Sequence, residues 1–105
     1  MMMRVTLTKH MEQDRLDRYA RIATEIGFGR TVMTIREEDR RRQHEASTLY
    51  LTSTGVLIIR NQQEEIITMY CPIVGQVKRH FGIERLPQFL FNAICNNYRR
   101  GYCAD

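Results

Sequence analysis

Apolar side chains recur with a helical period in the first part of the chain. Between Thr8, a candidate N-cap, and Gly27, they fall on one side of a helix, while His10 falls with charged residues on the opposite side. Gly27 and Gly29 bracket Phe28 and are typical of a helix end where the chain changes direction. The pattern predicts an amphipathic helix that packs through Leu16, Tyr19, Ala20, Ala23 and Ile26.

The period changes to two after this helix. Alternation predicts a strand over Arg30–Arg36, and the charged residues 37–47 are interpreted as an exposed loop or a short polar helix. Three more strands are predicted over Thr48–Thr52, Val56–Arg60 and Ile66–Cys71. The short turns between them imply an antiparallel meander, and the apolar run of the third predicted strand favours a central position.

Helical spacing returns after the predicted sheet. Ile73–Phe81 is predicted to form a short helix that Gly82 ends, and Leu86-Pro87 opens a final helix that runs to about Tyr98. No repeat, low-complexity tract or linker interrupts the 105 residues. We therefore expect one α+β domain over residues 1–105, with the N-terminal amphipathic helix packed on a four-stranded, mainly antiparallel sheet and helices at the C-terminus.

Strand periodicity divides the predicted sheet into two faces. One is apolar and is expected to pack under the first helix; it consists of Met33, Ile35, Leu49, Leu51, Leu57, Ile59, Ile67 and Met69. The other is expected to be open; it consists of Thr34, Arg36, Thr48, Tyr50, Thr52, Ile58, Arg60, Thr68 and Tyr70. A solvated face is ordinary for an antiparallel sheet, but arginines can also hold phosphates, and tyrosines can stack on bases. Arg36, Tyr50 and Arg60 are therefore candidate nucleic-acid contacts.

Positive charge is concentrated at one end of the chain. The 16 Lys and Arg against 12 Asp and Glu give a net charge of +4. The first 75 residues hold 11 basic and 10 acidic residues, so most of the excess lies in the C-terminal third. This distribution favours RNA or another anionic partner, with Lys78, Arg79, Arg99 and Arg100 as candidate contacts. His80 beside them is interpreted as part of a solvated helix face or as a further nucleic-acid contact.

Other features exclude several classes of protein. The three cysteines lack CxxC spacing and are interpreted as thiols of a reducing cytoplasm, so we expect no metal site and no cofactor. No apolar run approaches the roughly 18 residues of a membrane span, and the charged start does not resemble a signal peptide. The sequence has no glycine-rich phosphate loop and no nucleophile elbow, so a small-molecule enzyme lacks support.

Two segments resemble small proteins of the barnase/EndoU/colicin/RelE-like (BECR) nuclease fold. Leu7-Thr8-Lys9-His10 precedes an arginine-bearing helix, and Gly55–Ile59 is followed by Ile66-Ile67-Thr68-Met69-Tyr70. These match a T-x-H helix start and a hairpin ending in hhTxY, where h is hydrophobic, over residues 4–71. The resemblance implies a metal-independent ribonuclease. His10 would be its general base or acid, Thr68 would orient the phosphate, and Tyr70 would donate a hydrogen bond or stack.

Two functional hypotheses follow. The first is a small RNA-binding protein that acts as a metal-independent ribonuclease toxin of a phage or mobile element. The second is a non-catalytic interaction or inhibitor module that binds nucleic acid or a protein, either an antitoxin or an inhibited target, through the open sheet face. Asp14 favours the second hypothesis, because the family often has an arginine at this position, four residues after the histidine.

Overall fold

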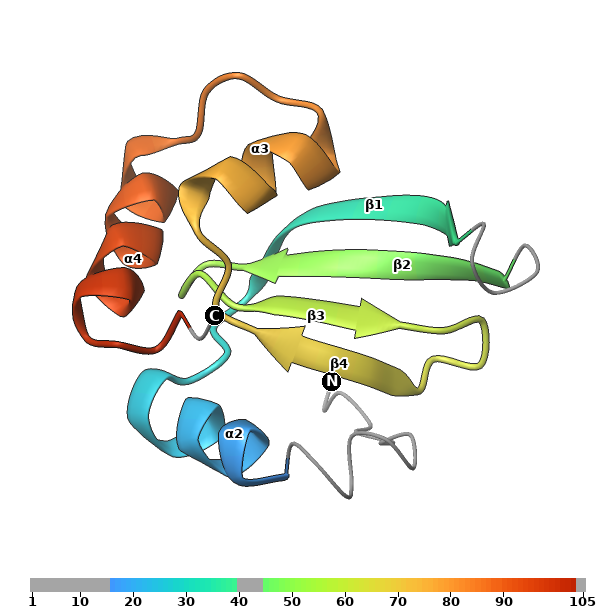
Figure 1. Cartoon of the computed structure of the whole chain (residues 1–105), viewed down its shortest axis with the longest axis horizontal. Coiled ribbons are helices and arrows are strands. Elements are labelled where there is room, and N and C mark those ends of the chain that lie inside the picture. The colour runs from blue at the N-terminus through green and yellow to red at the C-terminus, as the bar shows by residue number, and fades with distance from the viewer. Residues whose placement is uncertain (1–15, 40–44, 104–105) are drawn as a thin grey trace.

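The computed structural model describes residues 16–39 and 45–103 (Figure 1). It confirms the predicted α+β class, with helices and a four-stranded antiparallel sheet. The predicted helix start at Thr8 and the candidate His10 lie outside the described residues. The elements in chain order are helix α2 (Leu16–Arg21), π-helical η1 (Ile22–Ile26), strands β1 (Thr31–Asp39), β2 (Glu45–Thr52), β3 (Leu57–Arg60) and β4 (Ile66–Tyr70), and helices α3 (Val74–Phe81) and α4 (Gln88–Arg99).

The sheet is a meander in the order β1-β2-β3-β4, with every neighbouring pair antiparallel. This order confirms the predicted meander and the central position of β3. The first two strands run further than predicted, because Glu37 pairs with Ser47. The loop-or-helix interpretation is therefore wrong for residues 37–39 and 45–47. An edge strand accommodates charged residues because its side chains can reach water, so charge density alone did not mark the end of β1.

Helices cover both faces of the sheet, α3 and α4 on one side and α2 with η1 on the other (Figure 1). The face of Leu49, Leu51 and Leu57 packs against Val77 of α3 and against Leu90 and Ile94 of α4. Met33 and Ile35 of β1 pack against the same cluster, so the expectation that this apolar face lies under the first helix is wrong for β1, β2 and β3. The C-terminal helices cover it instead.

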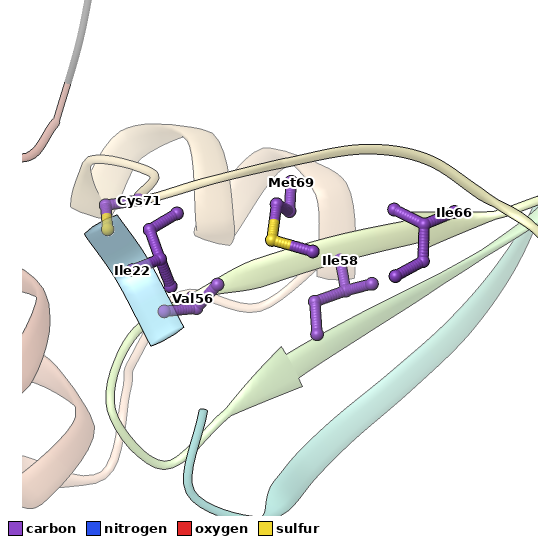
Figure 2. Close-up of a cluster of buried hydrophobic side chains, with 6 residues drawn as sticks. All are labelled: Ile22, Val56, Ile58, Ile66, Met69 and Cys71. Atoms are coloured by element: carbon purple, nitrogen blue, oxygen red, sulfur yellow. The ribbon is translucent and has the colours of Figure 1, made fainter. Parts of the chain in front are cut away.

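The first helix packs on the opposite face. Ile22 of η1 is 3% exposed and lies beside Val56 and Cys71 (Figure 2). The same cluster contains Ile58, Ile66 and Met69. Leu16 is 50% exposed, and Ala20 and Ala23 are exposed as well, so the predicted packing side is wrong at these three residues. Tyr19 and Ile26 do pack against the cluster and flank Ile22 at helical spacing. Part of the face predicted to be open is thus a second buried layer.

Strand β4 lies one residue out of the predicted alternation. Ile58 pairs with Met69 and Leu57 pairs with Tyr70, while the register shifts between Ile59 and Arg60. Directly paired residues of an antiparallel sheet share a face, so Met69 lies with Ile58. Tyr70, and Thr68 which pairs with Ile59, lie on the α3/α4 face. The predicted grouping of Thr68 and Tyr70 with Tyr50 and Arg60 is wrong, because a one-residue slip moves every side chain of a strand to the other face.

The turn between β2 and β3 contacts both helical layers. The Thr54 hydroxyl donates to the Gly27 carbonyl at 2.7 Å, and the Asn97 side-chain amide of α4 donates to the Thr54 carbonyl at 2.8 Å. Gly55 has a φ of +81° and is buried against α4. A Cβ at this position would lie 2.9 Å from Asn97 Nδ2 and 3.3 Å from the Ile94 nitrogen. The close contacts at Thr54 and Gly55 therefore position the second half of α4 against the sheet.

Candidate nucleic-acid site

Helix α3 presents three basic side chains in its last turn. The helix begins after Ile73, whose backbone N–H donates to Gln76 Oε1 at 3.0 Å and so is satisfied at the helix start. It ends at Gly82, which adopts the left-handed conformation (φ 63°, ψ 37°) that glycine permits. Val77 anchors the helix in the core at 1% exposure. His80, three residues later, therefore lies at the margin of the buried side, while Lys78 and Arg79 are exposed.

The His80 imidazole lies between a carboxylate and a phenol. Its Nδ1 is 3.5 Å from Glu37 Oε1 of β1, and its Nε2 is 3.5 Å from the Tyr70 hydroxyl of β4. The side chains of His80 and Glu37 are 28% and 39% exposed, so the group is partly sheltered but open to solvent. We call Glu37, Tyr70 and His80 the His80 cluster. Three separate elements bring it together on the α3/α4 face.

The Tyr70 hydroxyl is held in its protonated form. Burial raises the pKa of Tyr70 above its ordinary value, the nearby Glu37 carboxylate raises this pKa further, and Arg79 opposes the shift. The hydroxyl therefore remains a hydrogen-bond donor at neutral pH.

The His80 cluster combines the groups that phosphodiester chemistry needs. A carboxylate can accept a proton, an imidazole can accept or donate one, and a neutral phenol can donate a hydrogen bond to a phosphate oxygen. The 3.5 Å separations are long for hydrogen bonds, but contacts of this kind commonly shorten when substrate binds. The exposed Lys78 and Arg79 immediately before His80 in the sequence add positive charge to this end of α3.

Of the predicted catalytic residues, the structure brings Thr68 and Tyr70 to this face. Thr68 lies two residues from Tyr70 on β4, is partly buried and has interactions of its own. The predicted histidine, His10, lies outside the described residues. The histidine that the structure places beside Tyr70 is His80.

The predicted arginines of the sheet lie on the opposite face and differ in exposure. Arg36 is exposed and pairs with Thr48, which in turn pairs with Arg60. Arg60, however, is 3% exposed, donates to the Glu64 carbonyl at 2.6 Å and stands 6.0 Å over the Tyr50 ring. The expectation of an open pair of phosphate-binding arginines is therefore wrong for Arg60, which holds the β3–β4 turn.

Tyr50 belongs to the same internal arrangement. Its hydroxyl donates to Glu64 Oε2 at 3.4 Å, and its pKa is raised by burial first and then by the Glu64 charge. Tyr50 also packs against the cluster under the first helix. Its ring is therefore engaged within the protein rather than presented as an open stacking surface.

The C-terminal arginines form a third location. Arg100 lies 4.7 Å and Arg21 4.8 Å from the centre of the Tyr102 ring, and Arg100 also donates to the Tyr102 hydroxyl at 3.1 Å. Hydrogen bonds from Tyr102 and Arg21 lower the pKa of Glu25. These contacts attach the C-terminal segment to the first helix. Arg99 is exposed at the end of α4. The predicted basic contacts thus divide between the ends of α3 and α4.

Sequence reasoning missed Glu37 and underrated His80. The sequence pattern predicts a charged loop or short polar helix at Glu37, and a solvated helix face or a nucleic-acid contact at His80. A local sequence pattern cannot predict that Glu37 on the edge strand β1 lies next to His80 at the end of α3, because the two residues are far apart in the sequence. The one usable signal was the helical spacing that puts His80 three residues after the buried Val77.

Comparison with known proteins adds no assignment. No protein-family model matches the chain, and no match was found among curated proteins or among solved structures. Within residues 16–39 and 45–103, no group of three or more His, Cys, Asp or Glu side chains could hold a metal ion. No helix in this described part is long and apolar enough to cross a membrane. The similarity to the nuclease fold stays a prediction from sequence motifs.

Proposed function

We propose that this protein binds RNA and cleaves it without a metal ion, with His80 rather than His10 as its acid–base histidine. The observation that carries the proposal is the position of the His80 imidazole, 3.5 Å from both the Glu37 carboxylate and the Tyr70 hydroxyl. The exposed cations Lys78 and Arg79 stand beside it.

The reaction is a transfer of the phosphate within RNA. Glu37 takes the proton of a ribose 2′-hydroxyl, and the 2′-oxygen attacks the adjacent phosphorus. The bond from phosphorus to the 5′-oxygen breaks, and protonated His80 gives its proton to that oxygen. Tyr70 donates a hydrogen bond to the phosphate, and Lys78 and Arg79 offset the charge of the transition state. The products are a 2′,3′-cyclic phosphate and a 5′-hydroxyl.

The test is cleavage of a labelled single-stranded RNA in the presence of EDTA. We expect His80→Gln and Glu37→Gln each to lower the rate by at least about 100-fold, the usual size of a general acid–base contribution. Glu84→Gln, a change at an exposed glutamate outside the cluster, is the matched control and should cleave at the wild-type rate. Far-UV circular dichroism of each variant checks that it is folded.

Binding is tested separately from cleavage. Lys78→Ala and Arg79→Ala should weaken RNA binding and lower its dependence on salt, since each phosphate contact contributes about 0.7 to the slope for single strands. Intact RNA at high protein concentration contradicts the enzymatic proposal. Loss of cleavage with His10→Gln but not with His80→Gln contradicts the choice of histidine and favours the assignment that the family resemblance implies.

A further inference from the structure

An apolar groove separates the first turn of α3 from the second half of α4. It has a volume of about 540 Å³, and its lining includes Ile73, Gly75, Cys95 and Tyr98. Two of the lining side chains are unusually exposed for their type, Ile73 at 44% and Tyr98 at 64%. Exposed apolar side chains that border one groove are typical of an interaction surface rather than of scattered surface residues.

The charge that the described residues bring to this groove is positive. Among the lining residues in the described part of the chain, Arg99 is the one that is charged, and Arg100 follows it at the end of α4. Lys78 lies one helical turn beyond Gly75 on α3. Within residues 16–39 and 45–103, no acidic residue lines the groove. A complementary partner would therefore offer apolar side chains to the groove and carboxylates to its basic rim.

We propose that the groove binds an amphipathic helix of another protein, with its apolar side in the groove and acidic side chains toward Arg99. A helix laid in a groove presents apolar anchors three, four and seven residues apart, which suits an open hollow between two helices. An RNA strand fits this groove less well, because its phosphates need polar or basic contacts along their path. The groove offers these at the Arg99 end, whereas the rest of the named lining is apolar.

This inference does not rest on RNA cleavage. The groove and the His80 cluster lie at opposite ends of α3, since Gly75 is in its first turn and His80 in its last. The axial separation is roughly 7.5 Å at the usual rise per residue. A bound helix would thus contact the same element as the cluster without using its side chains, so binding can be measured whether or not the protein cleaves RNA.

The test uses two synthetic 16-residue peptides with leucines in the same helical pattern. One carries glutamates at its polar positions and the other carries lysines. We expect the glutamate peptide to bind, by fluorescence anisotropy, at least tenfold more tightly than the lysine peptide. Tyr98→Ser and Arg99→Glu should each weaken its binding at least tenfold. The matched control is Phe91→Ser, because Phe91 is another exposed aromatic residue of α4, at 42%, that does not line the groove.

Backbone amide chemical shifts locate the peptide. Gly75 and Cys95 should shift on titration with the glutamate peptide, whereas Glu84 should not. Equal binding of the two peptides, no binding of either, or an equal loss with Phe91→Ser overturns the proposal. A 12-nucleotide single-stranded RNA that displaces the peptide and loses affinity in Tyr98→Ser would also overturn it, because the groove would then be an RNA site.

Discussion

Replacement of the buried Gly55 by alanine should destabilise the protein more than the same change at Gly82, which also has a positive φ but has open space where a Cβ would lie. Gly55 has a φ of +81°, and a Cβ there would lie 2.9 Å from Asn97 Nδ2 and 3.3 Å from both the nitrogen and Cγ1 of Ile94. The Asn97 amide can move only by giving up its 2.8 Å hydrogen bond to the Thr54 carbonyl. The Ile94 nitrogen belongs to the backbone of α4, so it moves only if the helix moves.

The size of the effect has two parts. A residue with a Cβ at positive φ costs roughly 1–2 kcal/mol. Overpacking against a well-ordered neighbour costs about 1–3 kcal/mol more. Gly55→Ala should therefore lower the free energy of unfolding by about 2–5 kcal/mol, a large share of the roughly 5–15 kcal/mol typical of a domain.

Gly82→Ala is the matched control. Gly82 also has a positive φ, +63°, but a Cβ there would have no neighbour within 4 Å. Gly82→Ala should therefore lower the free energy of unfolding only by the cost of a Cβ at positive φ, roughly 1–2 kcal/mol. Both variants gain equally from the smaller entropy of the unfolded chain, so the difference between them isolates the contact with α4.

Guanidinium unfolding followed by far-UV circular dichroism measures both variants, provided that the transition is two-state and its slope is unchanged. Equal losses for Gly55→Ala and Gly82→Ala would refute the reasoning, because the close approach of α4 to this turn would then carry no energetic weight.

Three further predictions concern two buried residues, Arg60 and Cys71. Arg60→Ala should lower the free energy of unfolding by about 1.5–3 kcal/mol, since it removes a charged hydrogen bond to the Glu64 carbonyl, whereas the exposed Arg36→Ala should change it by less than about 0.5 kcal/mol. If guanidinium titrations gave the same free energy of unfolding for Arg60→Ala and Arg36→Ala, the structural role of Arg60 would be contradicted. Burial raises the pKa of the Cys71 thiol to about 11, so iodoacetamide at pH 8 should modify Cys71 far more slowly than the half-buried Cys95, as read by peptide mass spectrometry. Stability should fall as pH rises from about 9 to about 11, because only the unfolded state then loses this proton, and Cys71→Ala should remove that part of the fall. Rapid native modification of Cys71 would contradict its burial.

Most element positions could be predicted because their boundaries are marked locally. The glycine of the β2–β3 turn, Gly82 after α3 and Pro87 before α4 each limit what the backbone can do, and the observed elements begin or end beside them. The faces of β4 could not be predicted in this way. Ile67 and Met69 alternate with Thr68 and Tyr70, but the register shift beside Arg60 decides which pair faces α3.

The assignment of helices to faces lay beyond local patterns for a related reason. Both faces of the central strands carry enough apolar residues to bury a helix, as Leu57 and Ile58 show on adjacent positions of β3. Which helix covers which face depends on the path of the chain after Gly27 and after Tyr70. The candidate site follows the same rule. Tyr70 was identified from a motif, but its neighbours Glu37 and His80 are set by long-range packing.

The β2–β3 turn and the β3–β4 turn differ in how freely the chain could be opened or lengthened. At Asn61–Glu65, the Asn61 side chain accepts hydrogen bonds from the backbone of Gln63 and of Glu65, so this turn is closed largely by its own groups. The turn at Thr54 instead joins the loop after η1 to α4 across the thickness of the molecule. New chain ends or an inserted tag at Gln63 would leave the two helical layers attached, whereas the same cut at Thr54 would separate both at once. The turn between β3 and β4, at Asn61–Glu65, is therefore the better place for new chain termini or an inserted label.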